Sequence, residues 1–169
     1  KPFLVLFMLR KDIDLNREYK KENKKEILHA KREFDNVREL IEFAGEEYVN
    51  KCAFSFKPNP NKSDIKRISF NQLRDDVRSL GSELISMGCS GKHCVLIGTF
   101  SYQWALTYFA ILSVGGILVP LDSEWSAEDL ADTAFKADAS FLFCDEDLSL
   151  KAEAIANKAN LEAPPVFLR

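Results

Sequence analysis

The stretch from Gly91 to Asp122 restricts the fold of this chain more than any other part of the sequence. An apolar run, His93 to Gly98, is followed by a polar turn and a largely apolar helix, Ser101 to Val114, and then by a second apolar run, Ile117 to Leu121. Continuous apolar strands on either side of a helix are typical of a parallel strand pair that is covered on both faces. The stretch therefore predicts an α/β fold with a mostly parallel sheet.

The same alternation continues towards the end of the chain. We expect a helix from Ser126 to about Ala137, a strand from Ala139 to Cys144, a helix near Leu148 to Asn160, and a fourth strand over Val166 to Leu168. Strand–helix alternation of this kind predicts a doubly wound sheet with flanking helices. Because the crossover connections are right-handed, the loops that follow the strands meet at one edge, where ligands usually bind.

A helix and a β-hairpin are expected before this alternating region. Asn36 can cap a helix over residues 37–50, and the runs Cys52 to Phe56 and Ile65 to Ser69 flank a turn rich in Pro and Asn. Ser69 and Gln72 form a capping box for a second helix, which ends at Gly88. The apolar stripes expected on the two helices are Val37, Leu40, Ile41, Ala44, Tyr48 and Val49 on the first, and Phe70, Leu73, Val77, Leu80, Leu84 and Met87 on the second.

The first 35 residues differ in character from the rest of the chain. They are dense in interleaved charges of both signs, so we interpret residues 1–35 as a charged leader that is helical or poorly ordered. The apolar run Phe3 to Leu9 is too short to span a bilayer, so no transmembrane segment is predicted. We interpret residues 36–169 as an incomplete N-terminal α/β subdomain, because the alternation breaks off at a strand.

Composition excludes several classes of function. The chain has 169 residues, and Lys+Arg 23 against Asp+Glu 26 gives a formal net charge of -3, which provides no electrostatic footprint for nucleic acid.

The 4 cysteines form no CxxC pair, and Cys94 and Cys144 fall inside apolar strands. Buried, reduced thiols are expected there, which favours a reducing cytoplasm as the location.

The sequence offers few candidates for a binding or catalytic group. It contains neither GxGxxG nor GxxxxGK, so no phosphate-binding glycine loop is predicted. Asp122 and Asp145 both follow apolar strands, and two carboxylates at one sheet edge could hold Mg²⁺, as in response-regulator receivers. The first strand, however, ends in Thr99-Phe100-Ser101 without an acid. We therefore favour carboxylates that cap turns.

Nucleophilic catalysis finds no support in the sequence. His93 and His29 have no nucleophile or acidic partner beside them, and Ser101 lacks the GxSxG elbow.

Three aromatic residues at helical spacing could line an apolar ligand tunnel, although packing of the helix on the sheet is the usual reason for such a stripe. They are Trp104, Tyr108 and Phe109.

Several motifs, in order along the chain, resemble those of the adenylate-forming enzymes, the family of acyl-CoA synthetases, luciferases and peptide-synthetase adenylation domains. Residues 68–73 (ISFNQL) resemble the (I/L)(T/S)(Y/F)xxL element, and residues 112–122 (LSVGGILVPLD) resemble the LxxGxxxVPLD element. Residues 91–97 resemble the G-(D/K)-x-V-x-(I/L) strand with one extra residue, residues 101–104 the NSxEW helix start, and Ala53-Phe54 the entry strand. The resemblance covers about Val37 to Asp147 and looks most like bacterial long-chain fatty-acyl-CoA synthetases.

The resemblance implies a parent enzyme that is an acid–thiol ligase using ATP, Mg²⁺, CoA and a fatty acid. The motifs present are scaffold elements, and no catalytic, cofactor-binding or metal-binding residue of the family maps onto this chain. The Ser/Thr/Gly-rich phosphate loop with its Pro-Lys-Gly ending, the later acidic ATP motif and the C-terminal catalytic Lys are all absent from these residues. Phe100 and Gln103 also depart from the usual Asn and Glu. The expectation is a fragment that is inactive alone and that requires the rest of its polypeptide.

Two alternatives remain open at the level of sequence. A stand-alone, non-catalytic α/β binding module would bind its ligand at the edge formed by Thr99, Asp122 and Asp145. A fragment of an amino-acid adenylation domain would share the same scaffold motifs. The fragment interpretation, in either form, predicts an exposed apolar surface and a tendency to aggregate.

Overall fold

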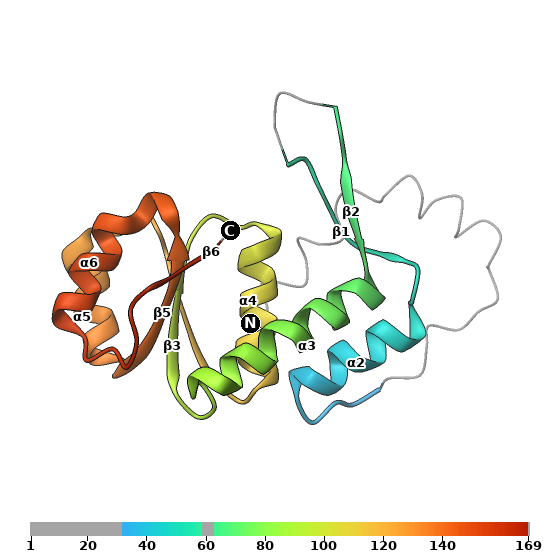
Figure 1. Ribbon diagram of the computed structural model, residues 1–169, viewed down its shortest axis with the longest axis horizontal. Coiled ribbons are helices and arrows are strands. Elements are labelled where there is room, and N and C mark those ends of the chain that lie inside the picture. Colours follow the sequence, from blue (N-terminus) through green and yellow to red (C-terminus); the bar gives the residue numbers. More distant parts are fainter. Residues whose placement is uncertain (1–31, 59–62, 169) are drawn as a thin grey trace. The chain divides into compact units, whose positions relative to one another are not determined.

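The computed structural model describes residues 32–58 and 63–168 (Figure 1). Contacts divide the chain into two units, residues 1–33 and 34–169, and only the second contains described helices and strands. The apolar run Phe3 to Leu9 and most of the charged leader lie outside the described residues. The elements, in order, are α2 (Val37–Glu47), β1 (Cys52–Phe56), β2 (Lys66–Ser69), α3 (Phe70–Met87), β3 (His93–Ile97), α4 (Tyr102–Ser113), β4 (Ile117–Leu121), α5 (Ala127–Lys136), β5 (Ala139–Asp145), the 3₁₀ turn η1 (Glu146–Leu148), α6 (Ser149–Lys158) and β6 (Val166–Leu168).

The centre of the second unit is a parallel sheet with the strand order β4-β3-β5-β6. β3 pairs in parallel with β4 on one side and with β5 on the other, and β5 pairs in parallel with β6. The edge strand β4 contains Pro120, which has no amide hydrogen to donate to a further strand. The predicted α/β class and the expected fourth strand over Val166 to Leu168 are both confirmed.

Both faces of this sheet are covered by helices, because successive side chains along β3 and β5 point to opposite sides. Cys94 and Leu96 pack with residues of α3 and α4, whereas Val95 and Ile97 pack with residues of α5 and α6. Figure 1 shows the same arrangement, with α5 and α6 on one side of the sheet and α4 and α3 on the other. The sheet is therefore doubly wound, as predicted.

Local capping signals fix where most helices begin. The side chains of Asn36, Ser69, Ser101 and Ser126 each accept a hydrogen bond from the backbone amide three residues later. Gly88 ends α3 with φ 87, the left-handed conformation expected of a glycine cap. The helix expected near Leu148 to Asn160 is present as α6, which follows the short 3₁₀ turn η1 and has no side-chain cap.

The first helix buries less of its apolar stripe than expected. Ile41 is buried, but Leu40 is 42% exposed and Val49 is 41% exposed. α2 ends at Glu47 rather than at Asn50, so Val49 lies beyond the helix. The close approach of α2 to α3 runs through Gly45, where an added Cβ would lie 2.8 Å from Arg74 Cβ. The flank of α2 that carries Leu40 therefore remains exposed to solvent.

The hairpin formed by β1 and β2 is antiparallel, as predicted, with a register shift between Cys52 and Phe54. Phe54 and Phe56 pack their rings against Tyr102, the first residue of α4, at centroid distances of 5.4 and 6.0 Å. The Tyr102 hydroxyl donates a hydrogen bond to Asp76 of α3. One largely buried tyrosine therefore joins the hairpin, α3 and α4.

Stability is expected to fall as the pH rises above about 9. Burial raises the pKa of Cys94 to about 12 and that of Cys144 to about 11, and burial together with the Asp76 hydrogen bond raises the pKa of Tyr102. Since the folded pKa values exceed the unfolded ones, the stabilisation is complete below the unfolded values and is lost as the pH approaches the folded ones. Urea unfolding measured at several pH values above about 9 gives the decline in the free energy of unfolding. In Tyr102→Phe, which lacks the phenol group, this decline should be shallower above about pH 10. Stability that does not change with alkaline pH would contradict the prediction.

Candidate functional site

The candidate site is the edge of the sheet where β3, β4 and β5 end. The register aligns Ile97, the last residue of β3, with Leu121 of β4 and Cys144 of β5, so the loops that follow these strands leave the same edge. In doubly wound folds, ligands bind at this edge. The structure confirms the edge and shows what each of its side chains does.

Thr99 and Asp145 are brought together at this edge. The Thr99 amide donates a hydrogen bond to Asp145 Oδ2 at 2.7 Å. The contact needs a glycine before Thr99, because a Cβ on Gly98 would lie 2.8 Å from the Asp145 carboxylate. Asp145 thus holds the end of β3 by a charge-assisted hydrogen bond.

Asp122 is not brought to the same point. Its Oδ1 accepts a hydrogen bond from the Glu124 amide at 2.9 Å, within its own turn. β3 lies between β4 and β5, so the two carboxylates follow strands that lie about 9–10 Å apart. In the part of the chain that the structure describes, no three or more His, Cys, Asp or Glu side chains form a group that could hold a metal ion. These residues do not fit a Mg²⁺ site: Asp122 caps its own turn, whereas Asp145 accepts from the amide of Thr99, which follows the neighbouring strand β3.

The other side chains singled out in the sequence have structural roles. Ser101 accepts a hydrogen bond from the Trp104 amide and caps α4. His93 begins β3 and pairs with the first residues of β4 and β5, while His29 lies outside the described residues. Neither Ser101 nor His93 has the hydrogen-bonded partner that a nucleophile or a general base would need within 32–58 and 63–168.

The aromatic residues of α4 stack on one another along the helix. Trp104 lies 5.5 Å from the ring of Phe100 and 5.5 Å from that of Tyr108, and Tyr108 meets Phe109 edge-on at 5.6 Å. Trp104, Tyr108 and Phe109 are partly buried against the larger core cluster, whereas Phe100 is 59% exposed. Packing against the core therefore accounts for the three residues of α4, and the exposed ring belongs to the loop at the candidate edge.

Lys151 is a residue at this edge that the sequence did not single out. Its Nζ donates hydrogen bonds to the carbonyl oxygens of Ser123 at 2.5 Å and Trp125 at 2.8 Å. Lys151 lies in the first turn of α6, and it holds the loop between β4 and α5 in place. Sequence offers no signal for this contact, because its acceptors are backbone atoms 26 and 28 residues away.

A cavity of about 230 Å³ lies away from this edge, between α2, α3 and the end of α4. Arg38 of α2 donates from Nε to the carbonyl oxygen of Ser113 at 2.8 Å. Ser113 is the last residue of α4, and the partial negative charge at a helix C-terminus favours a cation such as this guanidinium. Ser113 lines the cavity, and its buried hydroxyl has no hydrogen-bond partner among the residues that the structure describes. A buried hydroxyl without a partner reduces stability.

Replacing Ser113 with alanine is expected to raise the free energy of unfolding by about 1 kcal/mol, because it removes the unpartnered hydroxyl and adds a better helix former. Urea denaturation measures the change. Ser82→Ala is the matched control, since the Ser82 hydroxyl lines the same cavity but donates to the Arg78 carbonyl oxygen. Destabilisation by Ser113→Ala would show that the hydroxyl contributes to stability and would contradict the prediction.

The fold is that of the N-terminal part of the adenylate-forming enzymes. The profile of the family described as AMP-binding enzyme matches residues 41–167. The chain belongs to this family, which confirms the resemblance seen in its motifs.

Individual relatives agree with the family assignment. Over 77 residues, the chain is 34% identical to the long-chain-fatty-acid–CoA ligase FadD15 of Mycobacterium bovis, a match that covers 45% of this chain and 13% of the relative. Over 65 residues, it is 35% identical to the mitochondrial medium-chain acyl-CoA ligase ACSF2 of Pongo abelii, covering 38% of this chain and 11% of the relative. The chain thus matches only a small part of each relative's length.

Solved structures share the fold. The long-chain-fatty-acid-CoA ligase FadD1 from Archaeoglobus fulgidus matches with a TM-score of 0.71 and 19% identity over 86% of this chain and 30% of its own. The anthranilate CoA ligase AuaEII, solved with anthranoyl-AMP, matches with a TM-score of 0.67 and 22% identity over 80% of this chain and 25% of its own. The region described here corresponds to the N-terminal part of the adenylate-forming fold.

Among the described residues, every helix is too short or too polar to cross a lipid bilayer.

Proposed function

We propose that this chain is the N-terminal scaffold of an ATP-dependent long-chain fatty acid–CoA ligase. The observation that carries the proposal is the family match over residues 41–167, which includes the sheet and its flanking helices. The similarity to the mycobacterial long-chain ligase supports the choice of substrate. In the proposed reaction, a fatty-acid carboxylate attacks the α-phosphorus of ATP and releases pyrophosphate, and the CoA thiolate then displaces AMP from the acyl-adenylate.

The chain alone is proposed to be inactive. Adenylation requires preorganised cationic donors around the phosphates. The carboxylates at the candidate edge, Asp122 and Asp145, accept hydrogen bonds from Glu124 and Thr99, and Lys151 donates to backbone carbonyls. The described side chains of this edge are thus used to hold its loops. Phosphate-binding and catalytic groups, and sites for ATP, Mg²⁺ and CoA, are assigned to the rest of the polypeptide.

The cytoplasm is proposed as the location. Cys89, Cys94 and Cys144 are free and buried, and Cys52 is free and exposed. Four free cysteines favour a reducing compartment, because oxidising compartments promote disulfide formation.

The experiment compares the chain alone with the chain extended by the coding sequence found downstream in the source DNA. Pyrophosphate release is measured with palmitate, octanoate, anthranilate and phenylalanine, and thioester formation with CoA. We expect the extended protein to release pyrophosphate with palmitate and to form its CoA thioester, and the chain alone to stay at background.

Other outcomes contradict particular parts of the proposal. Palmitate-dependent release by the chain alone would refute its inactivity. Activity of the extended protein with phenylalanine only would identify an amino-acid adenylation domain, and activity with octanoate or anthranilate only would refute the long-chain substrate. A stop codon directly after Arg169 would leave a binding module.

A further inference from the structure

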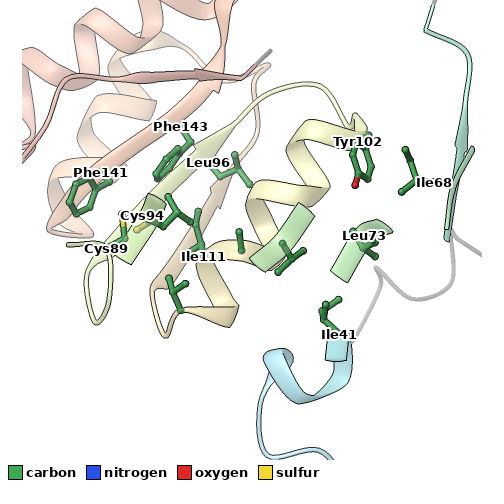
Figure 2. Packing of buried hydrophobic residues seen from close by; sticks show 14 residues of the cluster. Ile41, Ile68, Leu73, Cys89, Cys94, Leu96, Tyr102, Ile111, Phe141 and Phe143 are labelled. Carbon is green, nitrogen blue, oxygen red and sulfur yellow. The ribbon is translucent and has the colours of Figure 1, made fainter. Parts of the chain in front are cut away.

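Two of the cysteines meet inside the protein. Cys89 follows the glycine cap of α3, and Cys94 is the second residue of β3. Both side chains are 0% exposed and belong to the same core cluster, and the Cys94 thiol donates a hydrogen bond to the carbonyl oxygen of Lys92, in the turn that joins the two cysteines, at 3.6 Å. Figure 2 shows the two side chains next to each other at the end of α3.

The backbone turn between α3 and β3 produces this contact. Gly88 has φ 87, and the Cys89 amide donates to the Leu84 carbonyl oxygen, which closes the end of α3. The Lys92 amide then donates to the Cys89 carbonyl oxygen at 3.1 Å, with Gly91 at φ 72. The chain reverses within these few residues, so Cys94 enters the sheet beside Cys89.

The remaining cysteines do not compete for this contact. Cys144 packs in the core cluster on the opposite face of the sheet, with residues of α5 and α6. Cys52 is exposed on the hairpin. The pair is not a metal site, because the described residues bring no third metal-binding side chain to it.

We propose that Cys89 and Cys94 form a reversible disulfide by exchange with a low-molecular-weight disulfide such as oxidised glutathione. In the first step, one cysteine thiolate attacks the external disulfide, forms a mixed disulfide and releases one glutathione thiolate. In the second step, the other cysteine thiolate attacks the mixed disulfide and releases the second glutathione. Two protein thiols are oxidised, one glutathione disulfide is reduced to two thiols, and the two thiol protons pass to solvent or to the released thiolates.

The contact makes this pair competent for the bond, and burial makes the bond slow to form. An S–S bond of about 2.05 Å requires side-chain rotation to bring the two sulfur atoms within bonding distance. Burial raises the pKa of both thiols, so few thiolates are present at neutral pH. Reagents reach the pair when the turn opens, and that turn is formed by the exposed residues Ser90, Gly91 and Lys92. A reducing compartment keeps the pair as dithiol, and oxidative stress would close it.

Peptide mapping tests the proposal directly, because a trypsin site separates the two cysteines. Cleavage after Arg78, Lys92 and Lys136 places Cys89 in peptide 79–92 and Cys94 in peptide 93–136. The full chain with Cys52→Ser is incubated folded with oxidised glutathione, quenched in acid, alkylated in denaturant and digested. We expect peptides 79–92 and 93–136 to be joined by a disulfide that a reductant cleaves, with Cys144 recovered alkylated in its own peptide.

Two variants serve as matched tests. Cys144→Ala should leave the cross-link unchanged, whereas Cys94→Ala should abolish it and leave Cys89 as a mixed disulfide or a free thiol. If Cys94→Ala does not fold, the peptide map of the oxidised parent chain still shows whether Cys89 and Cys94 are joined by a disulfide. Recovery of Cys89 and Cys94 in separate alkylated peptides after prolonged oxidation of the folded chain would overturn the proposal. A cross-link that joins either of them to Cys144, or that forms only in denaturant, would overturn it as well.

Discussion

Replacing Phe143 with alanine is expected to lower the free energy of unfolding by about 4 kcal/mol. Phe143 lies in the middle of β5, is 2% exposed, and packs in the core cluster with α3 and α4. Truncating it removes the transfer free energy of a phenyl ring and leaves a cavity, which the close-packed neighbours fill only in part. Since β5 pairs with both β3 and β6, the loss weakens the centre of the sheet.

Urea denaturation monitored by circular dichroism measures the effect. Leu150→Ala is the control, because this leucine of α6 is 80% exposed and should change the free energy of unfolding by less than about 0.5 kcal/mol. A loss below about 1 kcal/mol for Phe143→Ala would mean that the site collapses onto the cavity, or that this face of the sheet is not tightly packed. Either result would contradict the packing described here.

Regular elements were predictable from the sequence because their signals are local. Ile117–Leu121 is a strand with the predicted bounds, since a short apolar run between a Gly-Gly break and Asp122 has few other conformations available. Ser69 and Gly88 mark the beginning and end of α3, because a capping hydroxyl and a left-handed glycine act on the nearest turn alone. These signals depend on neighbouring residues, and a linear sequence displays them directly.

Burial was harder to predict because it depends on what lies opposite a helix. Leu40 continues the apolar periodicity of α2, yet no described element covers it, and it stays 42% exposed. Periodicity reveals which side of a helix is apolar, but it does not reveal how wide the covering element is. The exposure of Leu40 is therefore a tertiary property.

The candidate site was predictable in outline only. Parallel topology placed Thr99, Asp122 and Asp145 at one edge, but it did not indicate that Asp145 binds the Thr99 amide and that Asp122 binds its own turn. The proximity of Cys89 and Cys94 in the core was missed for the same reason (Figure 2). Such contacts depend on side-chain rotamers and on loop paths, for which the sequence has no periodic signal.

The contact between Gly98 and Asp145 leads to the second prediction, a pair of coupled substitutions. Gly98→Ala is expected to lower the free energy of unfolding by about 1–2 kcal/mol, because the new methyl group displaces the Asp145 carboxylate from the Thr99 amide. The distances support this result: an added Cβ would lie 2.8 Å from the carboxylate, which itself lies 2.7 Å from the amide nitrogen. Asp145→Ala should cost about 1 kcal/mol, since it removes the same hydrogen bond.

The double variant Gly98→Ala/Asp145→Ala distinguishes this contact from two independent defects. Once the carboxylate is absent, the methyl group at position 98 has room, so the double variant should be about as stable as Asp145→Ala alone. The coupling free energy in the cycle should then be about 1 kcal/mol or more, whereas substitutions without a shared contact would add within about 0.5 kcal/mol. Additive effects, measured by urea denaturation of all four proteins, would show that Asp145 does not hold the end of β3. In that case, the Asp145 carboxylate would be free to bind a ligand at the edge, while Asp122 would still accept from the Glu124 amide.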